Sequence, residues 1–405
     1  MNARNRVGSL EPCVPEAAGM SSSRLERMAE AIDREIQEGR LPGAVLAIAR
    51  SGRLVYCKAH GYRDFENDVA LTEDDLFWAA SMTKPVAAVG ALTLYEEGRL
   101  QLADPLSRHL PQFGDVRVAD LEAGALKTVD PVREPTIQDL MRHTSGIVEG
   151  LLGSTEVHRL YVDAVGDGMT DLTGEEFAER LSRVPLLHQP GAVWHYGWGF
   201  DLLGLIVQSI TGQRLSEFLK ARVFEPLGMS DSTFGLPGEV DRYARPLPKD
   251  PWTGNPQQLP DLSRARFDSG GAGIVTTARD YLRFAVMLAG ETGIHQSGLP
   301  GRKTIELMMS DHLGCDVDDH RIAVQEPTLA GYGFGLGVAV RRHHGLSPAA
   351  GTPGDVTWPG ASGAYWWADP QEELAVVFMA HTPSRPARRY YRQLVRALVL
   401  QAIVE

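Results

Sequence analysis

Apolar residues recur every three to four positions in several stretches, which is the spacing of an amphipathic helix. In residues 21–43 the apolar positions form one stripe, made of Leu25, Met28, Ile32 and Ile36. Ser23 and Glu26 fit a capping box at the start of this helix. The same period predicts helices in 136–147, 173–184, 199–229, 276–291 and 385–404.

Alternating or continuous apolar runs near both ends of the chain predict β-strands. Residues 43–64 form two such runs joined by the turn residues Ser51 and Gly52, which predicts a hairpin. Further strands are predicted in 332–340, 361–370 and 373–381. The fold class is therefore α/β (α+β). We expect a discontinuous α/β subdomain in 1–85 and 265–405, a mainly helical subdomain in 86–264 with a cleft-covering loop in 147–190, and one catalytic unit.

The stretch 77–100 places a lysine at the head of an otherwise apolar helix. Pro85 fits only the first turn of a helix, and Gly98 marks its end. Ser81 and Lys84 are three residues apart, so they share one face of the first turn. Because burying an ammonium is costly, this S-x-x-K pattern favours a serine nucleophile beside an amine that can take its proton. A helix cap followed by a surface lysine is the alternative.

Composition and charge narrow the classes of function. The chain has 405 residues, is 43% hydrophobic and carries a net charge of −12, which argues against a phosphate-binding nucleic-acid surface. No stretch approaches the roughly 18 apolar residues of a membrane span, and residues 1–20 lack the apolar core of a signal peptide. Cys13, Cys57 and Cys315 are odd in number and widely spaced, as in a reducing compartment. We expect a cytoplasmic protein.

A tyrosine lies in the glycine-rich turn of residues 190–212, directly before an apolar helix. From such a turn, the phenol of Tyr196 could relay a proton between the serine and a leaving group. For a lone tyrosine, an aromatic that anchors the loop by packing is the stronger interpretation.

Residues 357–370 form a third candidate element. Pro359 removes a hydrogen-bond donor and so predicts a strand, or a strand start, at a sheet edge. Gly360 would let a substrate approach the backbone, and the N–H of Ala361 could then serve as an oxyanion donor. An aromatic-rich edge strand with a turn explains this stretch equally well.

Together the three elements occur in the order and spacing of a known family. The chain resembles the serine β-lactamase and penicillin-binding-protein superfamily, in particular class C β-lactamases and family VIII carboxylesterases. The likeness covers nearly the whole chain and rests on PGAVLAIARSGRLVY, SMTKP, LMRHTSGI, PGAVWHYGWGFDLLG, FEPLGMSDSTF, SGGAGIVTTARDYLRF and WPGASGAYWW. It implies a β-lactamase-like fold, in which helices flank an antiparallel sheet and a helical subdomain adjoins it.

The resemblance also implies roles for the matching residues. Ser81 would be the acylated nucleophile, and Lys84 and Tyr196 would form the proton-transfer network, with the division of labour between them open. The N–H groups of Ser81 and Ala361 would form the oxyanion hole.

Two positions depart from the lactamase pattern. Trp198 stands where lactamases carry the Asn of Tyr-x-Asn, and Trp358-Pro359-Gly360 stands where they carry Lys-Thr-Gly. The missing Asn and Lys normally hold the amide side chain and carboxylate of a lactam. Their loss predicts weak recognition of anionic lactams, and the indoles of Trp198 and Trp358 favour apolar acyl or alcohol groups.

Two histidines and two charged runs are weaker candidates for the chemistry. His143 and His195 could act as bases in a Ser-His-Asp triad, but no serine lies in a G-x-S-x-G elbow. His143 is better interpreted as a loop-fixing hydrogen-bonding residue, and an extended segment would point His195 away from Tyr196. The acidic and histidine-rich runs 315–320 and 341–344 lack the spacing of metal sites and are typical of surface loops.

We therefore expect a cofactor-free serine carboxylesterase that cleaves small esters through an acyl-enzyme on Ser81. A β-lactamase, a D-aminopeptidase or an acyl transferase with the same Ser-Lys-Tyr site are the competing hypotheses among enzymes. A binding or sensor module that is acylated once and then stalls is the competing hypothesis from another class. The expected partner is a small ester, with no nucleic acid and no membrane, and the sequence carries no signal for the oligomeric state.

Overall fold

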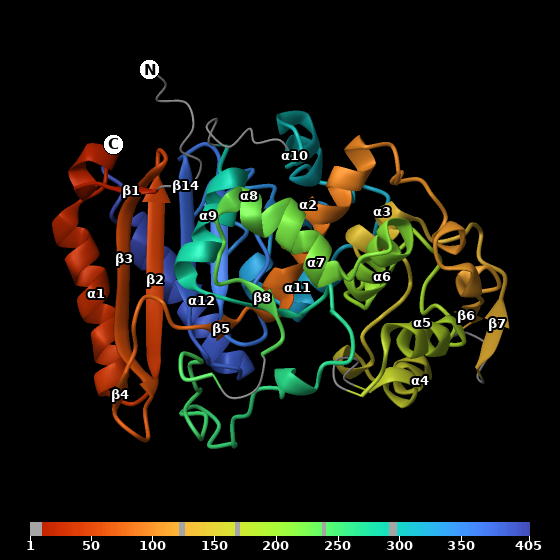
Figure 1. Cartoon of the computed structure of the whole chain (residues 1–405), viewed down its shortest axis with the longest axis horizontal. Helices are drawn as coiled ribbons and strands as arrows, with labels where there is room; N and C mark the ends of the chain where they lie inside the picture. Colours follow the sequence, from red (N-terminus) through yellow and green to blue (C-terminus); the bar gives the residue numbers. More distant parts are fainter. Residues whose placement is uncertain (1–9, 121–125, 167–170, 237–239, 291–297) are drawn as a thin grey trace.

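A computed structural model of the chain describes residues 10–120, 126–166, 171–236, 240–290 and 298–405 (Figure 1). A large β-sheet with its covering helices occupies one half of the molecule, and shorter helices and loops occupy the other. No helix within the described ranges is both long and apolar enough to cross a bilayer.

The large sheet combines strands from both ends of the chain. In spatial order its strands are β1 (Glu11–Pro12), β3 (Arg53–Asp64), β2 (Gly43–Arg50), β14 (Leu374–Met379), β13 (Tyr365–Asp369), β12 (Val356–Thr357), β11 (Ala339–Arg341) and β10 (Tyr332–Phe334), and β4 (Val69–Ala70) pairs with β3. Every pair is antiparallel except β1 with β3. The hairpin predicted for 43–64 is confirmed, and its turn residues Ser51 and Gly52 have φ angles of 49° and 73°.

Helices cover both faces of this sheet. Helices α1 (Ser22–Gln37) and α12 (Arg385–Leu400) lie on one face, and α2 (Thr83–Glu96) and α9 (Ala278–Leu288) pack on the other (Figure 1). Strand β2 is buried along its whole length, because its successive side chains enter opposite layers. Val45 and Ala47 join the core around α2 and α9, whereas Leu46 and Ile48 join the core around α1 and α12.

The remaining helices lie mostly in the other half of the molecule, around α2. They are α3 (Ile137–Met141), α4 (Glu156–Val165), α5 (Gly174–Ser182), α6 (Gly199–Thr211), α7 (Leu215–Leu219), α8 (Glu225–Leu227), α10 (Arg302–Met308) and α11 (Arg321–Gln325). The helices predicted from periodicity are present, although Glu291, at the end of one predicted stretch, lies outside the described residues. The subdomain boundaries at 85/86 and 264/265 stay a prediction.

Two small sheets complete the part of the fold that the structure describes. Strands β5 (Phe77–Trp78), β9 (Ile274–Thr276) and β8 (Thr233–Phe234) form one of them, in the order β5-β9-β8. Strands β6 (Val118–Asp120) and β7 (Lys127–Val129) form the other, at the outer edge of the helical half (Figure 1).

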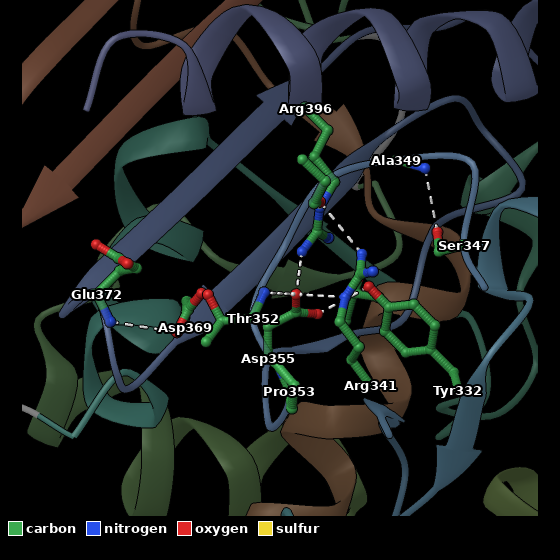
Figure 2. A network of polar contacts seen from close by, with 12 residues as sticks. Tyr332, Arg341, Ser347, Ala349, Thr352, Pro353, Asp355, Asp369, Glu372 and Arg396 are labelled. Carbon is green, nitrogen blue, oxygen red and sulfur yellow. Dashed lines mark hydrogen bonds and ion pairs between the residues drawn. The ribbon is translucent and has the colours of Figure 1, made fainter. Parts of the chain in front are cut away.

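A buried ion cluster fastens α12 to the far end of the large sheet (Figure 2). Asp355 is fully buried, and its carboxylate pairs with the guanidinium groups of Arg341 and Arg396. It also accepts a hydrogen bond of 2.8 Å from the hydroxyl of Tyr332 on β10. Moving α12 away would separate Arg396 from Asp355 and leave a buried charge uncompensated, which is costly. The cluster therefore fixes the position of α12.

Two local predictions are wrong. No capping box forms at Ser23 and Glu26. Helix α1 begins at Ser22, whose N–H donates instead to the carboxylate of Glu16 at 2.8 Å. Pro359 does not mark a sheet edge either, because β12 lies between β11 and β13. The proline follows the last paired residue of β12, where the ladder needs no donor.

Candidate active site

Ser81 lies in a short 3₁₀ turn, Ala80–Met82, between β5 and α2. Ala80 has a φ of 48°, a left-handed conformation that residues with a side chain rarely adopt. The hydroxyl of Tyr281 on α9 donates a hydrogen bond of 2.8 Å to the carbonyl of Met82 and so holds the turn. Local backbone strain of this kind is often found at functional sites, because the surrounding structure must enforce it.

Lys84 lies one helical turn after Ser81 and is only 4% exposed. Its Nζ donates to the carbonyl of Gly271 at 2.8 Å and lies 3.4 Å from Ser81 Oγ. The same atom lies 4.5 Å from the centre of the Tyr196 ring. The lysine is therefore inside the protein beside the serine, and the interpretation as a surface lysine is wrong.

Tyr196 completes the group of three predicted catalytic side chains. Its Oη lies 2.7 Å from Ser81 Oγ, and its ring is 5% exposed. The loop that carries it is held from the other side of the site, because the N–H of Glu149 donates to the Tyr196 carbonyl at 3.2 Å. The structure thus brings the predicted nucleophile together with both side chains of the predicted proton-transfer network, across a separation of up to 115 positions in the sequence.

Trp358 and Ala361 line the same cavity as Ser81. The Trp358 ring lies 5.3 Å from that of Tyr196 and 5.1 Å from that of Phe334, so it supports the tyrosine as well as facing the cavity. Within the described residues, the N–H of Ala361 donates no hydrogen bond, which leaves it available as an oxyanion donor.

Gly360 has a different neighbour from the one predicted. A Cβ at this position would come within 2.6 Å of the carbonyl oxygen of Ala79. The glycine therefore permits a close approach of two backbone segments near Ser81, and it is not among the residues that line the cavity. Its predicted contact with substrate has no support in this arrangement.

Trp198 also lies away from the cavity. Helix α6 begins at Gly199, and the Trp198 ring packs edge-on against Phe177 of α5 at 5.5 Å, inside the main hydrophobic core. Position 198 therefore gives the cavity neither the amide of a lactamase nor an apolar surface. The predicted contact between its indole and substrate is not supported.

The cavity beside Ser81 has a volume of about 150 Å³. Sequence reasoning missed most of its polar wall, which consists of Glu149, Gln325, Glu326, Arg385, Arg388, Arg389 and Arg392. Glu149 and Leu152 belong to the segment 147–190 that we expected to cover the cleft, of which residues 167–170 lie outside the described part. Burial raises the pKa of the Glu149 carboxyl, and the charge on Lys84 opposes that rise.

His143 packs against the site, and its backbone carbonyl accepts a hydrogen bond of 2.8 Å from the N–H of His195, in the loop that carries Tyr196. The ring of His143 lies 4.6 Å from the Tyr196 ring, and its Nε2 is buried without a partner among the described residues. Burial, reinforced by the charge on Lys84, lowers its pKa well below the ordinary value. A neutral ring without a hydrogen bond to Ser81 does not favour a Ser-His-Asp triad.

His195 belongs to a second cluster, on the side of the loop away from Tyr196. Its Nδ1 lies 3.1 Å from His188 Nε2, and its Nε2 lies 3.4 Å from His158 Nε2. Burial, together with the nearby charge of Arg321, lowers the pKa of His188 to about 4 and that of His195 to about 3, while Asp318 acts in the opposite direction on His188. These rings are therefore neutral at physiological pH.

The histidine cluster predicts a loss of stability in acid. The free energy of unfolding should fall as the pH drops from about 6.5 toward 4, because the rings stay neutral in the fold but bind protons when unfolded. His188 alone should account for on the order of 1–2 kcal/mol. Urea unfolding between pH 7 and about 4.5 measures the effect. His188→Gln should flatten the profile and the exposed His343→Gln should not, so equally steep profiles would contradict this assignment.

The runs 315–320 and 341–344 were considered above as metal ligands, but several of their charged side chains form ion pairs at the surface. Asp318 pairs with His320, and Asp319 pairs with Arg342. Across the described ranges, no group of three or more His, Cys, Asp or Glu side chains is placed to hold a metal ion.

Comparison with known proteins gives matches over most of the chain. A family model described as Beta-lactamase matches residues 28–401. Protein Rv1367c of Mycobacterium tuberculosis is 33% identical over 355 residues, which cover 85% of this chain and 87% of that protein. Esterase EstB of Burkholderia gladioli is 32% identical over 392 residues, covering 91% and 93%.

A solved structure agrees with the fold. That of EstCE1, described as a hydrolase with promiscuous acyltransferase activity, superposes with a TM-score of 0.77 at 28% identity. The match covers 93% of this chain and 98% of that one. The fold predicted from the resemblance, a mostly antiparallel sheet flanked by helices, is confirmed.

Proposed function

Because the chain belongs to the beta-lactamase family, we propose that it is a carboxylesterase that cleaves small esters through an acyl-enzyme on Ser81. It is a serine hydrolase of the β-lactamase fold, and its relatives include an esterase and a hydrolase with acyltransferase activity. One observation carries the proposal: Ser81 Oγ lies 2.7 Å from Tyr196 Oη and 3.4 Å from Lys84 Nζ.

The proposed reaction divides one acyl transfer into two steps. Ser81 Oγ attacks the ester carbonyl carbon while its proton passes to the Lys84–Tyr196 pair, and the N–H groups of Ser81 and Ala361 stabilise the developing oxyanion. The pair then protonates the departing alcohol. In the second step the same groups activate a water, which releases the acid and restores Ser81.

The walls of the site favour an ester over a lactam. Trp358 occupies the position of the lactamase lysine, and Trp198 is turned into the core, so neither position offers the usual partner for a lactam carboxylate or amide. A cavity of about 150 Å³ holds a group of roughly benzene size, which favours a short acyl chain.

A side-by-side assay tests this proposal. With purified protein, kcat/KM for a chromogenic acetate or butyrate ester should exceed that for a chromogenic cephalosporin by about 10²–10⁴, because a lactam amide would lack its hydrogen-bond partner. A long-chain ester should be a poorer substrate than the short ones. Comparable values for the cephalosporin and the short ester would favour a β-lactamase instead.

The time course of the same assay distinguishes an esterase from a sensor module and from an acyl transferase. An acylation-only sensor would release one equivalent of alcohol and then stop, whereas an esterase continues at a steady rate. An acyl transferase would form a new ester when a second alcohol is added, and product analysis would reveal it. We expect steady release of the free acid as the main product.

A further inference from the structure

Asp201 is a buried carboxyl group that the proposed reaction does not yet use. It lies in the first turn of α6, shortly after Tyr196, and is 2% exposed. Burial raises the pKa of its carboxyl, and the charge on Lys84 is the strongest influence in the opposite direction. A buried acid is costly to ionise unless charges and hydrogen bonds compensate it. Asp201 therefore interacts with the lysine of the proposed proton-transfer pair.

Hydrogen bonds and a helix N-terminus favour the charged form of Asp201. Its Oδ1 accepts the hydroxyl of Ser269 and, at 3.4 Å, the N–H of Gly271. The hydroxyl oxygen of Ser269 itself accepts the N–H of Ala272 at 2.9 Å, so the serine is held with its proton toward the carboxylate. The positive end of the α6 dipole adds to this stabilisation. These contacts hold Asp201 as a carboxylate at neutral pH.

The backbone of Gly271 connects this carboxylate to Lys84. The N–H of Gly271 faces Asp201 Oδ1, and its carbonyl accepts Lys84 Nζ at 2.8 Å. A Cβ at this position would come within 2.4 Å of Asp201 Oδ2, so only glycine lets the backbone lie this close. A continuous series of contacts therefore runs from Ser81 through Lys84 to a buried negative charge.

Further titratable groups face Lys84 from the side of the cavity. The Tyr196 ring lies 4.5 Å from Lys84 Nζ, and His143 is neutral because burial and the charge on Lys84 both lower its pKa. Glu149 also feels the charge on Lys84, and burial raises the pKa of its carboxyl. Glu149 lines the cavity, whereas Asp201 does not. Asp201 is therefore the carboxylate whose surroundings stay the same whatever the cavity holds.

We propose that Asp201 is a positioning residue for the reaction at Ser81. Its hold on the Gly271 backbone orients Lys84, and its negative charge stabilises the ammonium that forms when Lys84 takes the proton of Ser81. This inference rests on the proposed function and deepens it. The proton moves from Ser81 Oγ to Lys84 Nζ and then to the departing alcohol, and Asp201 exchanges none. An opposite charge nearby, in a site with little water, favours the charged form of an amine.

Asp201→Asn separates the charge of this residue from its shape. The amide oxygen can still accept both hydrogen bonds, so the variant loses the charge alone. With a chromogenic acetate ester, kcat should fall about 10-fold with little change in KM. The pH at half-maximal kcat/KM should move down by about one unit, because the ammonium is no longer stabilised. A role in folding alone would lower the amount of active protein and leave this pH unchanged.

Asp280 provides the matched control. It is also 2% exposed and lies in the first turn of α9. Its carboxylate accepts the N–H of Asp231 at 2.8 Å, and the charges of Arg283 and Asp231 act on it. Asp280→Asn should therefore leave the pH at half-maximal kcat/KM unchanged, even where it lowers the melting temperature. A profile of folded Asp201→Asn that coincides with the wild-type profile would overturn the proposal.

A stability measurement tests the same link without relying on activity. In a Glu149→Gln background, Lys84→Ala leaves Asp201 as an uncompensated buried carboxylate, which is relieved when it takes up a proton. The unfolding free energy lost through Lys84→Ala should therefore be smaller at about pH 5 than at about pH 8. Urea unfolding of both proteins measures this loss, and the histidine cluster, present in both, cancels. An equal loss at the two pH values would overturn the link, also where Asp201→Asn does not fold.

The outcomes separate this proposal from the esterase proposal. Steady turnover by the wild type, with an unchanged pH profile in Asp201→Asn, would overturn the role of Asp201 and leave the esterase standing. No turnover of any ester by the wild type would overturn the esterase proposal and with it the role of Asp201 in that reaction. The unfolding experiment would still measure the coupling between Asp201 and Lys84.

Discussion

Ser81→Ala is expected to abolish ester turnover, with a loss of up to about 10⁶-fold in kcat. The variant removes the only atom that the proposed reaction acylates, and its two neighbours, Lys84 Nζ and Tyr196 Oη, cannot replace it. Hydrolysis of a chromogenic acetate ester by purified protein measures the loss. Far-ultraviolet circular dichroism and thermal unfolding show whether the fold is intact.

A second buried serine provides the matched control. Ser145 is buried in the loop after α3, and its Oγ accepts only the N–H of Ile147, at 3.3 Å, among the described residues. Ser145→Ala should therefore keep most of the activity. A fluorophosphonate should label Ser81 in the wild type and in Ser145→Ala. Near-normal turnover by a folded Ser81→Ala, or a label on another serine, would place the nucleophile elsewhere.

The fold was largely predictable, because its main signals are local. The alternation in β2 and the turn at Ser51 and Gly52 each depend on neighbouring residues only, and both predicted the observed hairpin. The prediction of a capping box at Ser23 was wrong because a residue outside the motif takes over the helix start. The carboxylate of Glu16 accepts the N–H of Ser22, and Glu16 lies outside the short stretch that defines a capping box.

The centre of the site was predictable in part. Ser81 and Lys84 are fixed relative to one another by a single helical turn, so their spacing indicated a shared face. Tyr196 is brought to them by tertiary structure, and only the resemblance to a family indicated that contact. The resemblance was a poor guide at Trp198. This larger side chain, directly before α6, packs against Phe177 in the core and does not face the cavity.

The arginines of the cavity's polar wall were not predicted, although the sequence carries a signal for them. The spacing of Arg385, Arg388, Arg389 and Arg392 indicates one helix face. An amphipathic helix normally turns such a face to solvent, and α12 turns it partly into the cavity. What fixes this orientation is the ion cluster of Asp355 with Arg341 and Arg396, whose members come from three separate segments.

Lys84→Arg is expected to lower kcat by about 10²–10⁴, although the positive charge is kept. The proposed role of Lys84 is to take the proton of Ser81, and a guanidinium stays protonated at any working pH. The site also leaves little space, since Lys84 is 4% exposed. Steady-state kinetics on a short ester measures the loss, and the exposed Lys58→Arg on β3 serves as the control.

Tyr196→Phe shows which group takes the proton. This change removes Oη but keeps the ring, which packs against His143 and Trp358, so the fold should be retained. If Lys84 is the principal base, Lys84→Ala and Lys84→Arg should both cost more activity than Tyr196→Phe, because only the lysine variants then remove the group that accepts the proton of Ser81. Wild-type rates for a correctly folded Lys84→Arg would contradict that role and would leave Tyr196 as the base.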